Sequence, residues 1–149
     1  VLETVRKLSW APDIIHCHGW MASLVPLYLK ELFKEDAHFE NTQIVTSLYN
    51  EGFKGTLNGS LHEKISFDGI HKDKVESIQI PTFDSLNGIA IQHSDAIIAG
   101  SKELTEETEA LFQSSELPKM KHSEAELGAA EVANFYDTIL EGKEVAVEE

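Results

Sequence analysis

Three short apolar runs, separated by segments with helical spacing, constrain the fold of this chain more than any other feature. The runs are Ile14–Cys17, Gln43–Tyr49 and Asp95–Ala99. A strand that is apolar along nearly its whole length is typical of a parallel sheet covered by helices on both faces. Strands that alternate with helices therefore predict an α/β fold with a three-layer parallel sheet.

The segments around these runs place apolar residues at helical spacing. Helices are predicted over residues 1–9, 21–33, 60–68, 82–93, 102–113 and 124–141. Thr82 and Ser101 are candidate N-caps, and the letters SEAE from Ser123 form a capping box before the last helix. Pro26 is expected in the first turn of its helix. A charged loop is predicted between residue 68 and residue 82, and the tail after Gly142 is expected to fray.

Length and charge limit the classes of function. The 149 residues suffice for one domain with its own core. The net charge of -14, with Arg6 as the only arginine, disfavours a polyanionic partner such as nucleic acid but is compatible with a neutral sugar or polysaccharide. No apolar run reaches the roughly 18 residues of a membrane span. The single cysteine, Cys17, excludes an intrachain disulfide and favours a reducing, cytoplasmic location.

The start of the chain suggests a fragment. Val1 stands apparently inside a helix, and three strands are few for a sheet of this kind. We therefore expect the front of the fold to lie outside this sequence.

The candidate site lies where the strands end, because ligands of open α/β sheets bind beyond the carboxyl ends of the strands. The three exits are His16–Trp20, Tyr49–Gly55 and Gly100–Ser101. The two-residue period places His16 and His18 on one side of the strand and Cys17 on the other. The histidines are interpreted either as packed strand-end residues or as contacts to a sugar hydroxyl.

Other chemistries find less support at these exits. A metal site needs three or four convergent ligands, and the sequence offers no CxxC or HExxH motif, so neither a metal nor a cofactor is predicted. Cys17 is interpreted as a buried hydrophobe rather than a nucleophile. Ser101 either caps a helix or binds an anion, and Trp20 either packs or offers a stacking surface. No catalytic residue can be named from the pattern.

Three segments resemble the glycogen and bacterial starch synthase family. PDIIHCHGWMASLVPLYLK is similar to the family segment P-D-[VI]-[VI]-H-x-H-D-W-H-[TAS]-x-L-x-P-x-Y-L. IVTSLYNEGFKG resembles the strand that ends in T-[VI]-H-N-x-x-[YF]-Q-G, and DSLNGIAIQHSDAIIAGSKELTEE resembles the helix-strand-helix unit that follows. Together the segments cover about residues 1–113, with the closest likeness to short bacteroidete-type members that carry only the first of two domains.

This resemblance implies a Rossmann-like sheet that forms the second half of the N-terminal domain of a GT-B glycosyltransferase. Residues 1–118 would be a partial starch-synthase catalytic domain, and residues 119–149 a C-terminal helix and tail packed on it. The family transfers glucose from a nucleotide sugar, usually ADP-glucose, to an α-1,4-glucan without a metal. Its second domain, which supplies most nucleotide contacts, would come from another part of the protein or another chain.

The residues that match the family pattern are His16, His18, Trp20, Asn50, Gly55 and Ser101. With Tyr49, which replaces a family histidine, they form the predicted substrate-binding set. Gly19 replaces an aspartate, Met21 a histidine and Asn87 a lysine. The expectation is a glycogen/starch synthase-like domain that transfers little or no glucose alone. Two alternatives stay open: a non-catalytic glucan- or partner-binding module, and one subunit of a split two-chain synthase.

Overall fold

A four-stranded parallel sheet forms the centre of the molecule. The computed structural model describes residues 1–123 and 128–147, with side chains as far as residue 142. The strands are β1 (Ile14–His18), β2 (Gln43–Leu48), β3 (Ala96–Ala99) and β4 (Lys119–Met120), and they lie in sequence order. The register places His16 beside Val45 and Leu48 beside Ala99. The predicted parallel α/β sheet is confirmed, whereas β4 was not predicted.

Helices account for most of the remaining chain. Their bounds are α1 (Leu2–Lys7), α2 (Leu24–Glu31), α3 (Leu61–Phe67), α4 (Phe83–Gln92), α5 (Glu106–Ser114) and α6 (Gly128–Val147), with 3-10 helices η1 (Trp20–Ala22) and η2 (Lys72–Ile78). No helix in the described ranges has both the length and the apolar character needed to cross a bilayer.

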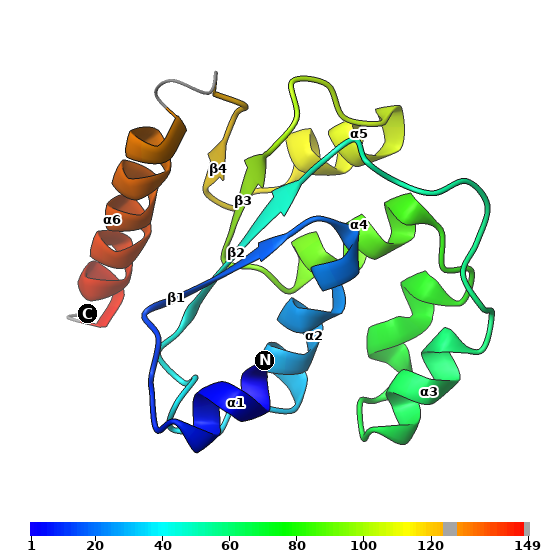
Figure 1. The fold of residues 1–149 in the computed structure, drawn as a ribbon, viewed down its shortest axis with the longest axis horizontal. Helices are drawn as coiled ribbons and strands as arrows, with labels where there is room; N and C mark the ends of the chain where they lie inside the picture. The colour runs from blue at the N-terminus through cyan, green and yellow to red at the C-terminus, as the bar shows by residue number, and fades with distance from the viewer. Residues whose placement is uncertain (124–127, 148–149) are drawn as a thin grey trace.

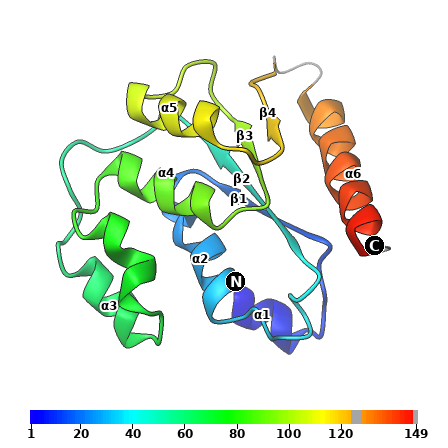
Figure 2. The ribbon, with the colours of Figure 1, turned by 180° about the vertical axis from the view of Figure 1, so that it is seen from behind.

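The sheet separates two unequal helical layers. Figure 1 shows α6 alone on one side and α2, α4 and α5 on the other, and Figure 2 shows the same arrangement from behind. On β2, Leu48 packs with Phe112 of α5, while Val45, three residues earlier and on the other face of the strand, packs with Ile139 of α6. This alternation follows the two-residue period of a strand and produces the expected three layers.

The segment between α3 and α4, predicted as a charged loop, contains a 3-10 helix. Lys72–Ile78 forms the 3-10 helix η2, in which Val75 and Ile78 are buried. These two side chains join the apolar cluster of α2, α3 and α4, around Leu27, Ile65 and Leu86. Charged residues concealed the signal, because only the few buried positions of a short helix need to be apolar.

Several predicted helix ends also differ from the structure. The helix predicted over 21–33 is divided into η1 and α2, with Pro26 in the first turn of α2 as expected. The capping box falls mostly on residues 124–127, outside the described residues. Helix α6 continues past Gly142 to Val147, so the prediction of a frayed tail is wrong for that stretch.

Thr105, rather than Ser101, caps helix α5. The Thr105 side chain accepts a hydrogen bond of 3.2 Å from the Thr108 backbone N–H, and its hydroxyl donates to the Asp84 carboxylate of α4. Ser101 lies five residues before the first helical residue, and its Oγ accepts the Asn50 backbone N–H at 3.0 Å. The residues from 101 to 105 therefore form a connection between β3 and α5 that the helical spacing did not reveal.

We expect Thr105→Ala to lower the free energy of unfolding by about 1–2 kcal/mol, because it removes both the cap and the bond to Asp84. Ser101→Ala should cost less, since it removes a single bond outside the helix. Urea unfolding of the two variants measures the difference. A larger loss for Ser101→Ala would contradict the assignment of the cap.

Candidate functional site

The three predicted strand exits meet at one edge of the sheet. Gly19 follows β1 with a φ of +68°, a conformation that glycine adopts at little cost, and its N–H donates to the Ser47 carbonyl at 3.0 Å. Gly100 follows β3, and its N–H donates to the Leu48 carbonyl at 2.7 Å. These two bonds extend the ladder and fix the exits of β1 and β3 on either side of Tyr49.

His16 joins the sheet to α6. Its Nε2 lies 2.7 Å from Ser47 Oγ, and its Nδ1 forms a hydrogen bond with the Tyr136 hydroxyl. A neutral imidazole has one N–H, so it donates to one of these hydroxyls and accepts from the other. Burial, followed by the repulsion of His18, lowers the pKa of His16 to about 4. The ring is therefore uncharged at neutral pH.

His18 and Tyr49 form a second polar pair beside the first. His18 Nδ1 lies 2.9 Å from the Tyr49 hydroxyl, and the rings of His16 and His18 are 3.9 Å apart between centroids. The Tyr49 ring rests on the backbone of Gly100, where a Cβ would come within 2.5 Å of a ring carbon. Glycine is required at position 100 because of this close approach.

These side chains line a cavity of about 410 Å³ between the sheet and α6. Polar groups come from His16, His18 and Ser47 on the strands, from Tyr49 just after β2, from His122 after β4 and from Tyr136 on α6. Ile98, Met120 and Val132 are among the apolar residues that complete the wall. The described lining contains no Lys, Arg, Asp or Glu. The cavity therefore offers hydroxyls and imidazole nitrogens, among them the uncharged ring of His16, next to an apolar surface.

The other predicted site residues lie around this cavity rather than in it. Trp20 packs against Phe53, with ring centroids 4.8 Å apart, and also lines a separate cavity of about 270 Å³ with His18 and Tyr49. Ser101 lines a third cavity of about 340 Å³. The backbone N–H of Asn50 donates a hydrogen bond to the Ser101 hydroxyl. Gly55, with a φ of +83°, lines none of these three cavities.

Two contacts of the site were not predicted. Ser47 lies two residues before Tyr49, on the same face of β2, so the strand period could have identified it. Tyr136 lies 120 residues after His16, and no local pattern connects them. The sequence therefore contained a signal for the first contact but not for the second.

Neither a metal nor a reactive thiol is indicated. Within residues 1–123 and the described part of α6, no group of three or more His, Cys, Asp or Glu side chains is placed to hold a metal ion. Cys17 is buried on the opposite face of β1 from His16, and burial raises its pKa to about 11. The thiol is therefore protonated at neutral pH and serves as a core residue.

Comparison with known proteins identifies the family. A model of the starch synthase catalytic domain matches residues 1–121. The chain belongs to the starch synthase catalytic domain family. The segments on which the resemblance was based all fall within this match. No solved structure matches the chain significantly.

Several curated relatives of this starch synthase domain are named glycogen synthases. The one from Chlorobium phaeobacteroides is 32% identical over 107 residues, which cover 69% of this chain and 20% of the relative. The one from Chlorobium luteolum is 43% identical over 65 residues, covering 44% and 13%, respectively. The Clostridium perfringens protein is 28% identical over 109 residues, covering 72% and 22%. The chain thus spans about a fifth of the length of the relatives with the longer matches.

The positions where this starch synthase domain departs from the family pattern have distinct surroundings. Gly19 forms the turn after β1, and Met21 is 84% exposed in η1. Asn87 is buried in α4, where its Nδ2 donates to Thr108 Oγ1 at 3.1 Å. Thr108 Oγ1 in turn donates to Asp84 at 2.7 Å. The Asn87 side chain therefore links α4 to α5 in this protein.

Acidification tests the environment of His16. The pKa of His16 lies below the ordinary value of 6.5, so between about pH 6.5 and pH 4 the unfolded chain binds a proton that the folded chain does not bind. Stability should therefore fall as the pH drops from about 6.5 towards 4, by about 1–2 kcal/mol at pH 5 for a half-buried ring. His16→Asn should lack this component. Thermal unfolding at pH 7.5 and 5.0 measures it. His122→Asn is the control, because His122 lines the same cavity but is exposed. Equal shifts in the wild type and both variants would contradict the expectation.

Proposed function

We propose that this chain is the glucan-binding part of a glycosyltransferase that moves glucose from a nucleotide sugar, such as ADP-glucose, to an α-1,4-glucan. Family membership and the glycogen synthase names of its relatives support the reaction class. The observation that carries the proposal is the convergence of three strand exits on one cavity with hydroxyl and imidazole groups. Such groups suit sugar hydroxyls, and the proposed reaction uses no metal or other cofactor.

We further propose that the chain transfers little or no glucose alone. Gly19, Met21 and Tyr49 stand where the family resemblance implies an aspartate and two histidines. Loss of one group that stabilises developing charge costs about 10²–10³ in rate. A second domain or chain would supply the nucleotide contacts. The single, buried cysteine is consistent with the cytoplasm as the location.

A transfer assay tests this function. The purified chain is incubated with radiolabelled ADP-glucose and glycogen, and a full-length glycogen synthase serves as the positive control. We expect incorporation at least about 10³-fold below the control, as a result of the lost charge stabilisers, together with measurable retention in glycogen-containing affinity gels. Glucose transfer near the control rate would contradict the proposed inactivity. Absence of any glycogen retention would contradict the glucan-binding role.

The chief alternative is a module that binds glucan but has no catalytic function in any assembly. The contact of Tyr136 with His16 favours it, because α6 lies beyond the family match and occupies one side of the candidate site. Reconstitution separates the two functions. Addition of a C-terminal nucleotide-binding half from a related synthase should raise transfer only if this chain is one part of a split enzyme.

A further inference from the structure

Helix α6 changes the candidate site although it does not belong to the matched family segment. The match ends at residue 121, and α6 begins at Gly128. Ile139 of α6 is 7% exposed and packs with Val45, Ala96 and Ile98 of the sheet. Val132 and Phe135 extend this contact along the helix. The helix is thus anchored on the sheet by apolar packing, and it presents Tyr136 to His16.

The sheet alone would leave the strand exits open on this face. With α6 present, the exits and the helix border an open cavity of about 410 Å³. This volume lies towards the lower end of the range of about 300–1,000 Å³ that is typical of ligand pockets. Gly128, Ala129 and Ala133 form part of the helix wall. The small size of these residues keeps the helix side of the cavity open. The space suits a short sugar better than a nucleotide sugar.

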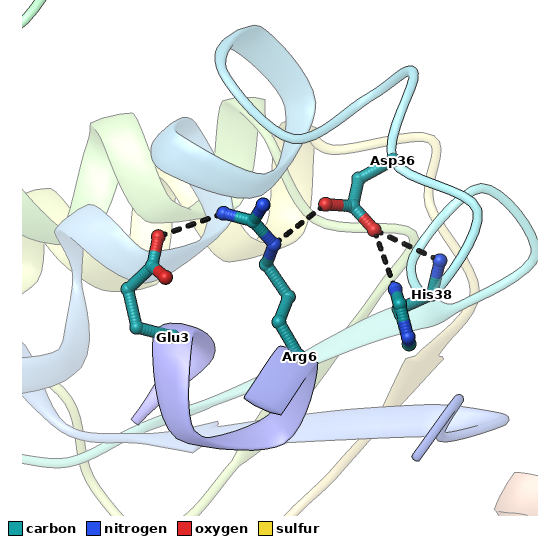
Figure 3. A network of polar contacts seen from close by, with 4 residues as sticks. All are labelled: Glu3, Arg6, Asp36 and His38. Atoms are coloured by element: carbon teal, nitrogen blue, oxygen red, sulfur yellow. Dashed lines mark hydrogen bonds and ion pairs between the residues drawn. The ribbon is translucent and has the colours of Figure 1, made fainter. Parts of the chain in front are cut away.

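Charge gives an independent indication of the ligand. A nucleotide diphosphate needs cationic partners, and no lysine or arginine is among the described residues of the cavity wall. Lys102 and Lys121 line the neighbouring cavity around Ser101, which shares Ala99 and His122 with this one. Arg6 lies on α1, where it pairs with Glu3 at 2.9 Å and with Asp36 at 2.8 Å (Figure 3). The cavity therefore favours an uncharged ligand.

We propose that α6 converts the strand exits into a pocket for one end of a glucan chain, which carries no charge, with Tyr136 as a residue that determines specificity. Tyr136 and Ser47 approach His16 from opposite ring nitrogens, so a sugar hydroxyl that enters can replace one of these partners without leaving the ring unsatisfied. This inference rests on the proposed function, and it adds the part of the substrate that binds and a residue outside the family segment that recognises it.

Titration of the purified chain with maltose tests the pocket. Binding is followed by calorimetry and by the histidine-ring NMR signals, and ADP-glucose is titrated in parallel. We expect maltose to shift the signals of His16 and His18, whereas ADP-glucose should leave them unchanged. Ala133→Trp fills the cavity and should weaken maltose binding at least tenfold. Ala130→Trp makes the same change at an exposed position that does not line the cavity, and it should stay within twofold of wild type.

Tyr136→Phe keeps the ring and removes only the hydroxyl, so it tests the pocket even if the tryptophan variant fails to fold. We expect a loss of maltose affinity of about five- to tenfold, the value of one hydrogen bond. Maltose binding that is equally strong in wild type, Ala133→Trp and Tyr136→Phe would overturn the pocket while the proposed function stands. Binding of ADP-glucose at His16 and His18 would overturn the preference for an uncharged ligand. Failure of wild type to bind maltose or glycogen would overturn both proposals.

Discussion

Gly100→Ala is expected to lower the free energy of unfolding by about 2–3 kcal/mol, because the new methyl group would overlap the Tyr49 ring. An ideal Cβ at position 100 lies 2.5, 2.6 and 2.8 Å from three ring carbons of Tyr49. The ring can avoid this overlap only by moving. Movement breaks the 2.9 Å contact between its hydroxyl and His18 Nδ1, and it changes the shape of the cavity.

A double-mutant cycle distinguishes this cause from a general effect on the backbone. Tyr49→Ala removes the obstructing ring, so Gly100→Ala should cost less than about 0.5 kcal/mol in that background. Gly59→Ala is the matched control, because no atom lies within 4 Å of its built Cβ and its φ is not in the left-handed region. Chemical denaturation gives all the values. A full loss that persists without the Tyr49 ring would show that position 100 tolerates no side chain for another reason.

The sequence was sufficient for the parts of the fold that depend on short-range patterns. The apolar runs identified β1, β2 and β3, and the helical spacing identified the helices that cover them. Strand β4 was missed because it has only two residues, and one of them, Lys119, is exposed. Its pairing is determined by the available edge of β3, at Ile97 and Ile98, rather than by its own composition.

The cap of α5 shows a related limit of sequence reasoning. Gly100 and Ser101 form an ordinary turn-and-cap pattern, yet the helix begins at Glu106. Thr105 is held by Asp84 of α4, 21 residues earlier in the chain. A contact between two helices thus decides where the second one begins. Local propensity carries no information about such a contact until the helices are packed.

The candidate site was predictable on the sheet side and unpredictable on the helix side. Parallel strands bring their carboxyl ends to one edge, so His18 and Tyr49 could be expected to meet. The contribution of α6 depends on how a helix beyond the family segment docks on the sheet, which rests on Ile139 and its apolar neighbours. The residues of α6 have helical spacing, but spacing alone does not specify the surface against which a helix packs.

Ile139→Asp should release α6 from the sheet and expose the candidate site. The side chain is 7% exposed among Val45, Ala96 and Ile98, where a carboxylate would lose its hydration without gaining a partner. We expect the free energy of unfolding to fall by about 3 kcal/mol or more. The loss cannot exceed the free energy with which the helix docks, because undocking lets the charge return to water. Amide hydrogen exchange should accelerate in α6 before it accelerates in β2 and β3.

Release of the helix should also change the titration of His16. Burial is the main cause of its low pKa, and Tyr136 forms part of the enclosure. In Ile139→Asp we therefore expect the pKa to rise from about 4 towards its ordinary value of 6.5, as followed by histidine-ring NMR. Thr138→Asp introduces the same charge at the adjacent, exposed position and should leave both the helix and the pKa unchanged. If His16 still titrates near 4 after α6 has been released, the strands alone provide its enclosure, and α6 does not form the second wall of the site.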